Sequence, residues 1–152
     1  LTTSCGFLTL FQAELQAAVS IPVLTSSLFM HKEIERDMVG GKKLGILTIA
    51  ASSLTSKHLE TANIPPETPI GTTESGIEFT AAILENRSQL DFEQSKSDNI
   101  KAAFELKAVH PELAAILLEC TNMPPYAKAI SEMTGLPVYS ILDGLNAIWR
   151  KA

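Results

Sequence analysis

The chain has 152 residues, 45% of them hydrophobic and 19% charged, which is typical of a globular protein with one substantial core. A formal net charge of −5 argues against nucleic-acid binding, because the 12 basic residues are dispersed rather than clustered. No apolar stretch approaches the roughly 20 residues needed to cross a bilayer, and the start of the chain lacks the pattern of a signal peptide. We therefore expect a cytoplasmic protein with a small-molecule or protein partner, no nucleic-acid partner and no membrane contact.

The N-terminal half predicts strands and helices in alternation. Residues 1–4 have no helix cap or linker pattern and resemble the end of a buried strand, so we expect part of the first sheet to lie upstream. Apolar periodicity and turn residues then predict a helix at 7–19, a strand at 21–24, a helix at 28–39 closed by Gly40 and Gly41, a strand at 43–50 and a helix at 55–63.

The C-terminal half continues the alternation. We expect a strand at 69–73, a loop with a short helix within 76–98, a helix from 98 or 99 to 110, a strand at 113–118, a helix at 124–135, a strand at 137–141 and a helix at 142–149. Such alternation predicts an α/β fold with parallel sheets flanked by helices. The glycine pair predicts a domain boundary, and the segments TTSCGF and LLECTN, which both place a cysteine between a strand and a helix, favour two related half-domains. One is formed by residues 1–41 with 138–152 and is incomplete at its N-terminus, and the other is formed by residues 42–137.

Cys5 and Cys120 each follow a predicted strand and precede a predicted helix. Two cysteines are too few for a disulfide scaffold, and they show no zinc-ligand spacing. In parallel α/β sheets, ligands bind beyond the carboxyl ends of the strands, where helix N-termini also lower the pKa of a thiol. We interpret the pair as facing acid/base thiols, although without their sequence context burial as inert residues would be the better interpretation.

The segments around these cysteines resemble a known superfamily. TTSCGFLTLFQAEL, IPVLTSSL, KLGILTIAASSLT and AILLECTNMPPYAKAISEMTGLPVYSI are similar to the aspartate/glutamate racemases, a superfamily that includes hydantoin racemases, maleate isomerases and arylmalonate decarboxylases. The resemblance implies two α/β domains that place one cysteine on each side of the substrate α-carbon. It also implies that no cofactor and no metal are needed.

The resemblance therefore predicts a racemase or epimerase of a small amino acid or related carboxylate, with Cys5 and Cys120 as catalytic residues. The hydroxyl, amide and backbone groups expected to bind the substrate carboxylate belong to Ser4, Gly6, Thr121, Asn122, Ser52 and Thr72. Gly6 stands where these racemases usually carry asparagine, which argues against aspartate or glutamate as the substrate. The alternatives are an enzyme like maleate isomerase or arylmalonate decarboxylase, and a non-catalytic carboxylate-binding protein, while a homodimer is left open.

Several other residues have two interpretations. Glu119 either tunes the adjacent Cys120 or caps the following helix. His31, His58 and His110 lie on different predicted helices without ligand-like spacing, and we expect them at the surface or at helix caps. The aromatic residues Phe11, Phe104 and Trp149 are expected in the core.

Overall fold

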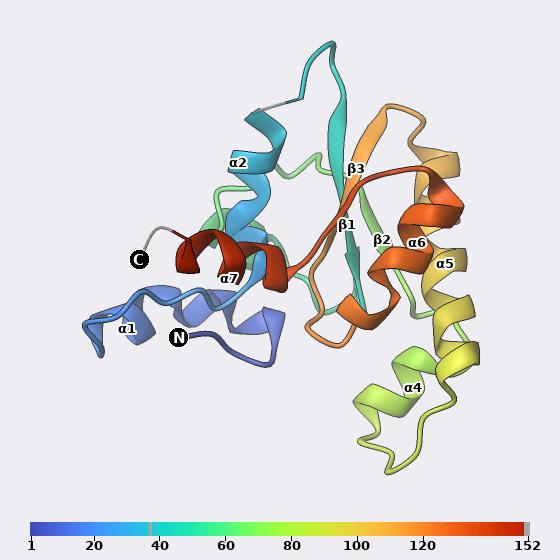
Figure 1. Cartoon of the computed structure of the whole chain (residues 1–152), viewed down its shortest axis with the longest axis horizontal. Coiled ribbons are helices and arrows are strands. Elements are labelled where there is room, and N and C mark those ends of the chain that lie inside the picture. The colour runs from blue at the N-terminus through green and yellow to red at the C-terminus, as the bar shows by residue number, and fades with distance from the viewer. Residues whose placement is uncertain (37, 151–152) are drawn as a thin grey trace.

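Four parallel strands form the centre of the computed structural model, which describes residues 1–36 and 38–150 (Figure 1). The strands are β1 (Lys43–Thr48), β2 (Ile70–Thr72), β3 (Leu113–Leu118) and β4 (Val138–Tyr139), in the order β2-β1-β3-β4. All three strand pairings are parallel. This confirms the predicted α/β fold with a parallel sheet flanked by helices.

Helices occupy most of the remaining chain. They are η1 (Gly6–Phe11), α1 (Gln12–Ala17), η2 (Ser27–Met30), α2 (His31–Arg36), α3 (Ser56–Thr61), α4 (Phe79–Leu84), α5 (Phe92–Val109), η3 (Pro124–Tyr126), α6 (Ala127–Thr134) and α7 (Ile141–Trp149). The helix predicted at 28–39 passes through residue 37, which lies outside the described residues. None of the described helices combines the length and apolarity needed to cross a bilayer.

The sheet separates two apolar layers because successive side chains of a strand point to opposite faces. On one face Leu47, Ile116 and Leu118 pack in a cluster that includes residues of α5 and α6. On the other face Ile46 packs in a cluster with Leu28 and with Leu59 of α3. Figure 1 shows α5 and α6 on the side of the sheet opposite α2. This double burial explains why β1 and β3 are continuous apolar runs.

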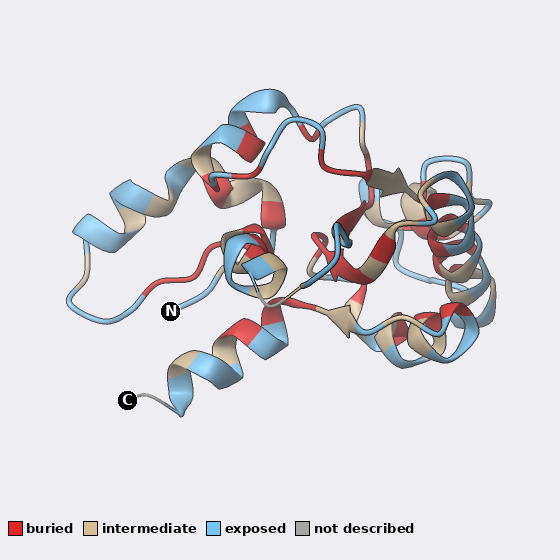
Figure 2. Cartoon of the chain, turned by 90° about the horizontal axis from the view of Figure 1, so that it is seen from above, coloured by how far each residue is buried: buried red, intermediate tan, exposed pale blue. Residues whose placement is uncertain are grey.

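The N-terminal region departs from the predicted strands. Within the described residues, the segments at 1–4 and 21–24 are joined by a single parallel bridge between Thr2 and Leu24 rather than by a sheet. No residue of α1 is buried, and Figure 2 shows this helix mostly exposed. The division into two half-domains remains a prediction, with its boundary at Gly40 and Gly41, which both have positive φ.

Helix α5 begins earlier than predicted. Asp91 is its N-cap and accepts a hydrogen bond from the Gln94 amide at 3.0 Å. Asp98, expected near the helix start, lies within the helix and accepts from the amides of Glu78 and Phe79 at 2.7 and 2.9 Å. Burial would raise the pKa of Asp98, but these donors outweigh it and lower the pKa. Asp98 therefore stabilises the start of α4 from a neighbouring helix.

Exposure corrects the interpretation of four side chains. Phe11, Phe104 and Trp149 are 50%, 42% and 82% exposed, so their assignment to the core was wrong. His31 is buried rather than at the surface, and burial lowers its pKa, but it does occupy a predicted cap position as the C-cap residue of η2. A periodic apolar pattern identifies one face of a helix, but that face is buried only where another helix or strand packs against it.

The other two histidines match their prediction as helix caps. His58 forms a capping box with Thr55 at the start of α3. His110 is the C-cap residue of α5.

Candidate active site

Residues 4–7, near the N-terminus, meet residues 119–122 at the carboxyl end of β3. Residues 119–122 follow β3 directly, and the hydroxyl of Thr121 donates to the carbonyl oxygen of Ser4 at 2.5 Å. Together they enclose a cavity of about 100 Å³. The cavity is lined by Ser4, Cys5, Gly6, Phe7, Ile49, Ile83, Leu84, Glu119, Cys120, Thr121 and Asn122. The structure thus places both cysteines and four of the six predicted carboxylate-binding residues around one small cavity.

Hydroxyl groups hold the segment that carries Cys5. Thr2 and Thr3 donate to the carbonyl oxygens of Leu24 and Thr25 at 2.8 and 2.7 Å. Ser27 then donates to the carbonyl oxygen of Leu118 at 2.6 Å, which ties this region to β3. Cys5 itself is exposed and is the N-cap residue of η1.

Cys120 lies on the buried side of the cavity. Burial raises the pKa of its thiol to about 11, and the charge of Glu119 acts in the same direction. Donors on Asn122 oppose this shift, including a side-chain contact from Nδ2 to Sγ at 3.9 Å. The expectation that a helix N-terminus lowers the pKa of this thiol was therefore wrong, because loss of solvation dominates.

Glu119 is a site residue to which the sequence assigns no single role. Its side chain is buried, and its Oε2 accepts a hydrogen bond from the Thr48 hydroxyl at 2.8 Å. Its Oε1 has no hydrogen-bond partner. Burial raises the pKa of the carboxyl group to about 7, although the Thr48 contact partly opposes the shift. The signal in the sequence is a carboxylate placed between a fully apolar strand and a site cysteine.

Gly6 makes room for Glu119. A Cβ atom at Gly6 would lie 2.1 Å from Oε1 and 2.4 Å from the backbone oxygen of Glu119, which is far inside van der Waals contact. The absence of a side chain at Gly6 is thus what allows η1 to approach the end of β3.

Gly6→Ala is expected to destabilise the protein by about 1–3 kcal/mol, because the new methyl group overlaps with backbone as well as side-chain atoms. Urea unfolding measures this change. Glu119→Ala in the same chain removes only the side-chain overlap, so the double variant should recover part of the loss. Unchanged stability of Gly6→Ala would contradict the close approach.

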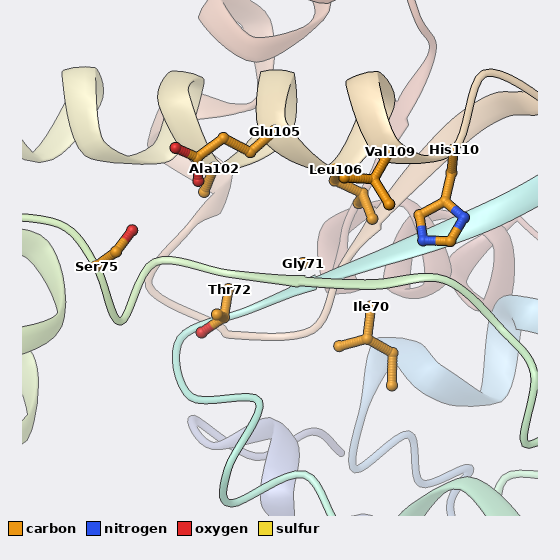
Figure 3. A pocket seen from close by; sticks show the side chains of 9 residues that line it. All are labelled: Ile70, Gly71, Thr72, Ser75, Ala102, Glu105, Leu106, Val109 and His110. Atoms are coloured by element: carbon orange, nitrogen blue, oxygen red, sulfur yellow. The ribbon is translucent and has the colours of Figure 1, made fainter.

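Ser52 and Thr72 lie elsewhere. Both hydroxyls donate to the carboxylate of Glu74, which also accepts from the Ala51 amide at 2.9 Å. The Ser52 hydroxyl is the main cause of a lowered Glu74 pKa. Thr72 also lines a separate cavity of about 240 Å³ between β2 and α5 (Figure 3). The structure does not bring these two residues among those that line the cysteine cavity.

The larger cavity between β2 and α5 carries no thiol. Figure 3 shows Glu105 and His110 on one side of it and Thr72 on the other. Within residues 1–36 and 38–150, no group of three or more His, Cys, Asp or Glu side chains is arranged to hold a metal ion. We therefore take the cysteine cavity as the candidate active site.

Comparison with known proteins relates the fold and the sequence to different enzymes. No family model matches the chain. A glutamate racemase isoform from Bacillus anthracis has a similar fold, with a TM-score of 0.62 and 18% identity over 100% of this chain and 58% of its own. A dimethylsulfoniopropionate lyase of Durusdinium sp. clade D is 28% identical over 93% of this chain and 48% of its own length. Dimethylsulfoniopropionate lyase 3 of Emiliania huxleyi is 28% identical over 97% of this chain and 41% of its own length.

These findings correct the functional prediction. The structural similarity supports the racemase-like fold, but the curated relatives that cover nearly the whole chain are named lyases. The prediction of a racemase or epimerase was therefore wrong, and so was its classification as an isomerase. The chain spans about half, or less, of the length of the curated relatives it matches, and it resembles proteins named as enzymes.

Proposed function

We propose that this chain supplies the cysteine-bearing part of a lyase that acts on dimethylsulfoniopropionate. The similarity to proteins named for that activity supports the substrate. The observation that carries the proposal is the small cavity in which both thiols lie, far below the roughly 300–1,000 Å³ of pockets for drug-sized ligands. Such a cavity suits a compact substrate with apolar methyl groups.

The proposed reaction is a β-elimination. A base removes a proton from C2, next to the carboxylate, and the electron pair of that C–H bond forms the C2–C3 double bond. The C3–S bond breaks and its electrons remain on sulfur, so the products are acrylate and neutral dimethyl sulfide. The proton stays on the base and then passes to water. A C2 proton is weakly acidic, so the negative charge that develops must be stabilised by nearby donors.

Cys120 is the base in this proposal. Asn122 donates to its sulfur from both the side chain and the backbone, and such donors favour the thiolate. The positive charge of the substrate also favours the thiolate when it binds nearby. Cys5 contacts the substrate from the other side of the cavity. Because dimethyl sulfide leaves as a neutral molecule, no acid is needed to protonate the leaving group.

The direct test is to incubate the purified protein with dimethylsulfoniopropionate. Gas chromatography of the headspace measures dimethyl sulfide, and proton NMR measures acrylate in equal amounts. A reaction without protein corrects for elimination by hydroxide. A folded protein that releases neither product above this blank at millimolar substrate would refute the proposal.

The activity should rise with pH. Because burial raises the pKa of Cys120 to about 11, the thiolate fraction of the free enzyme grows nearly tenfold for each pH unit below that value. We therefore expect kcat/KM, which reports on the free enzyme, to increase throughout the range from about pH 7.5 to 9.5. Blank-corrected initial rates measure it, and a plateau that begins near neutral pH would contradict Cys120 as the buried base.

A further inference from the structure

Among the described residues that line the cysteine cavity, Glu119 carries the only carboxyl group. The same residues include no lysine, arginine or histidine, and their other ionisable groups are the thiols of Cys5 and Cys120. The remaining surface is largely apolar, with Phe7, Ile49 and others contributing. The charge distribution of this cavity therefore favours a positively charged ligand and disfavours a simple anion.

Only one of the two carboxyl oxygens of Glu119 has a hydrogen-bond partner. Thr48 satisfies Oε2, whereas Oε1 is buried without a partner. Buried carboxyl groups are normally paired, and an unpaired one is costly. Gly6 has no side chain and therefore leaves room for the carboxyl group. A larger residue at this position would force the carboxyl group away. A buried carboxyl group with one unpaired oxygen, in the wall of a cavity, attracts a positive charge that binds in that cavity.

We propose that Glu119 selects a cationic substrate by attracting the sulfonium group from the wall of the cavity, an assignment that rests on the proposed function. A sulfonium ion has no N–H or O–H group to donate, so it is recognised by charge and by contacts to its methyl groups. The carboxylate supplies the charge, and Phe7 with the aliphatic residues supplies apolar and aromatic contacts. The substrate carboxylate is repelled by Glu119 and is directed towards the polar side of the cavity, where Ser4 and Asn122 lie.

The arrangement also links binding to chemistry. Burial is the main cause of the raised pKa of Cys120, and the charge of Glu119 adds to it; a cation next to Glu119 offsets that added effect. The ligand that Glu119 recognises thus helps to form the thiolate that reacts with it. A ligand of the same shape in which an uncharged carbon replaces the sulfonium would bind without this effect.

The test compares dimethylsulfoniopropionate with 4-methylpentanoate, a carboxylate of the same shape in which carbon replaces the sulfonium. Calorimetry on a Cys120→Ser background, which prevents turnover, gives both dissociation constants. We expect a preference for the sulfonium of at least about tenfold, reduced to near unity by Glu119→Gln. Glu112→Gln is the matched control, because Glu112 directly precedes β3 whereas Glu119 directly follows it. This variant should retain the preference for the sulfonium. Carbon-13 NMR of the Glu119 carboxyl group, in a chain without a substitution at Glu119, should show its pKa falling only with the sulfonium.

The outcomes separate the two proposals. Equal affinity for both ligands, with cleavage of dimethylsulfoniopropionate intact, would overturn the role of Glu119 and leave the proposed function standing. A preference that survives Glu119→Gln would do the same. Failure of the protein to bind or cleave dimethylsulfoniopropionate would overturn the proposed function and this assignment with it.

Discussion

Replacing Cys120 with serine is expected to lower kcat for dimethyl sulfide release by roughly 10²–10⁴-fold. Serine keeps the size and the contact with Asn122, but its hydroxyl group is a far weaker acid than a thiol and supplies almost no anionic base at neutral pH. Headspace chromatography measures the rate. Circular dichroism and urea unfolding check that the variant folds.

Cys5→Ser tests whether the second thiol also transfers a proton. One-base elimination with a neutral leaving group needs no second proton-transfer group, so we expect a smaller loss at Cys5, about tenfold, from altered contacts. Two variants that lose activity equally would show that both thiols transfer protons. A Cys120→Ser protein with normal activity would remove Cys120 from the mechanism.

The centre of the sheet was predictable because β1 and β3 are buried on both faces, whereas β2 and β4 are only partly buried. The strand at 113–118 has the predicted bounds, and β1 lies within the predicted 43–50. The N-terminal strands were not predictable in the same way, because the extended segments at 1–4 and 21–24 meet only through one bridge. Strand formation there depends on pairing with distant chain rather than on the local apolar pattern.

The meeting of the two cysteine segments at the candidate site could be predicted from the sequence, whereas the electrostatics of that cavity could not. Because loops at the carboxyl ends of parallel strands converge, the neighbours of Cys5 and Cys120 were expected to meet, and they line one cavity. The burial of Glu119 depends on Gly6 from the far end of the chain, and no local pattern reveals it. Ser52 and Thr72 looked equally suitable, but a neighbouring carboxylate, Glu74, accepts their hydroxyl groups.

The reaction was the least predictable property. Removal of a proton next to a carboxylate is common to racemases and to the proposed elimination. The fate of the resulting carbanion depends on whether the adjacent carbon carries a leaving group, and therefore on how the cavity recognises that group. The cysteine motifs predict the first step, but the side chains that recognise the substrate decide the second. This difference explains how a racemase-like fold can accompany relatives that are named lyases.

Glu119 should also give the protein an unusual dependence of stability on pH. Its pKa is raised from 4.5 to about 7 in the folded protein, so the folded state holds a proton that the unfolded state has released between these values. The contribution of Glu119 to stability is thus fully present below about pH 4.5 and is lost as the pH rises through 7. With about 1.4 kcal/mol for each pKa unit, the full loss amounts to about 3.5 kcal/mol.

Urea unfolding of the wild type and of Glu119→Gln at about pH 5 and pH 8 isolates this contribution. His31 acts in the opposite direction, because its lowered pKa makes the folded protein more stable as the pH rises towards 6.5. The raised pKa of Cys120 lowers the stability of the folded protein only above about pH 9.0, the ordinary pKa of a cysteine thiol. Both groups are present in the two proteins, so the difference between them reports on Glu119. We expect Glu119→Gln to gain about 2.5 kcal/mol relative to the wild type between the two pH values. An equal response of the two proteins would mean that Glu119 is ionised at pH 5, so that its carboxylate has a partner or solvent in the free protein.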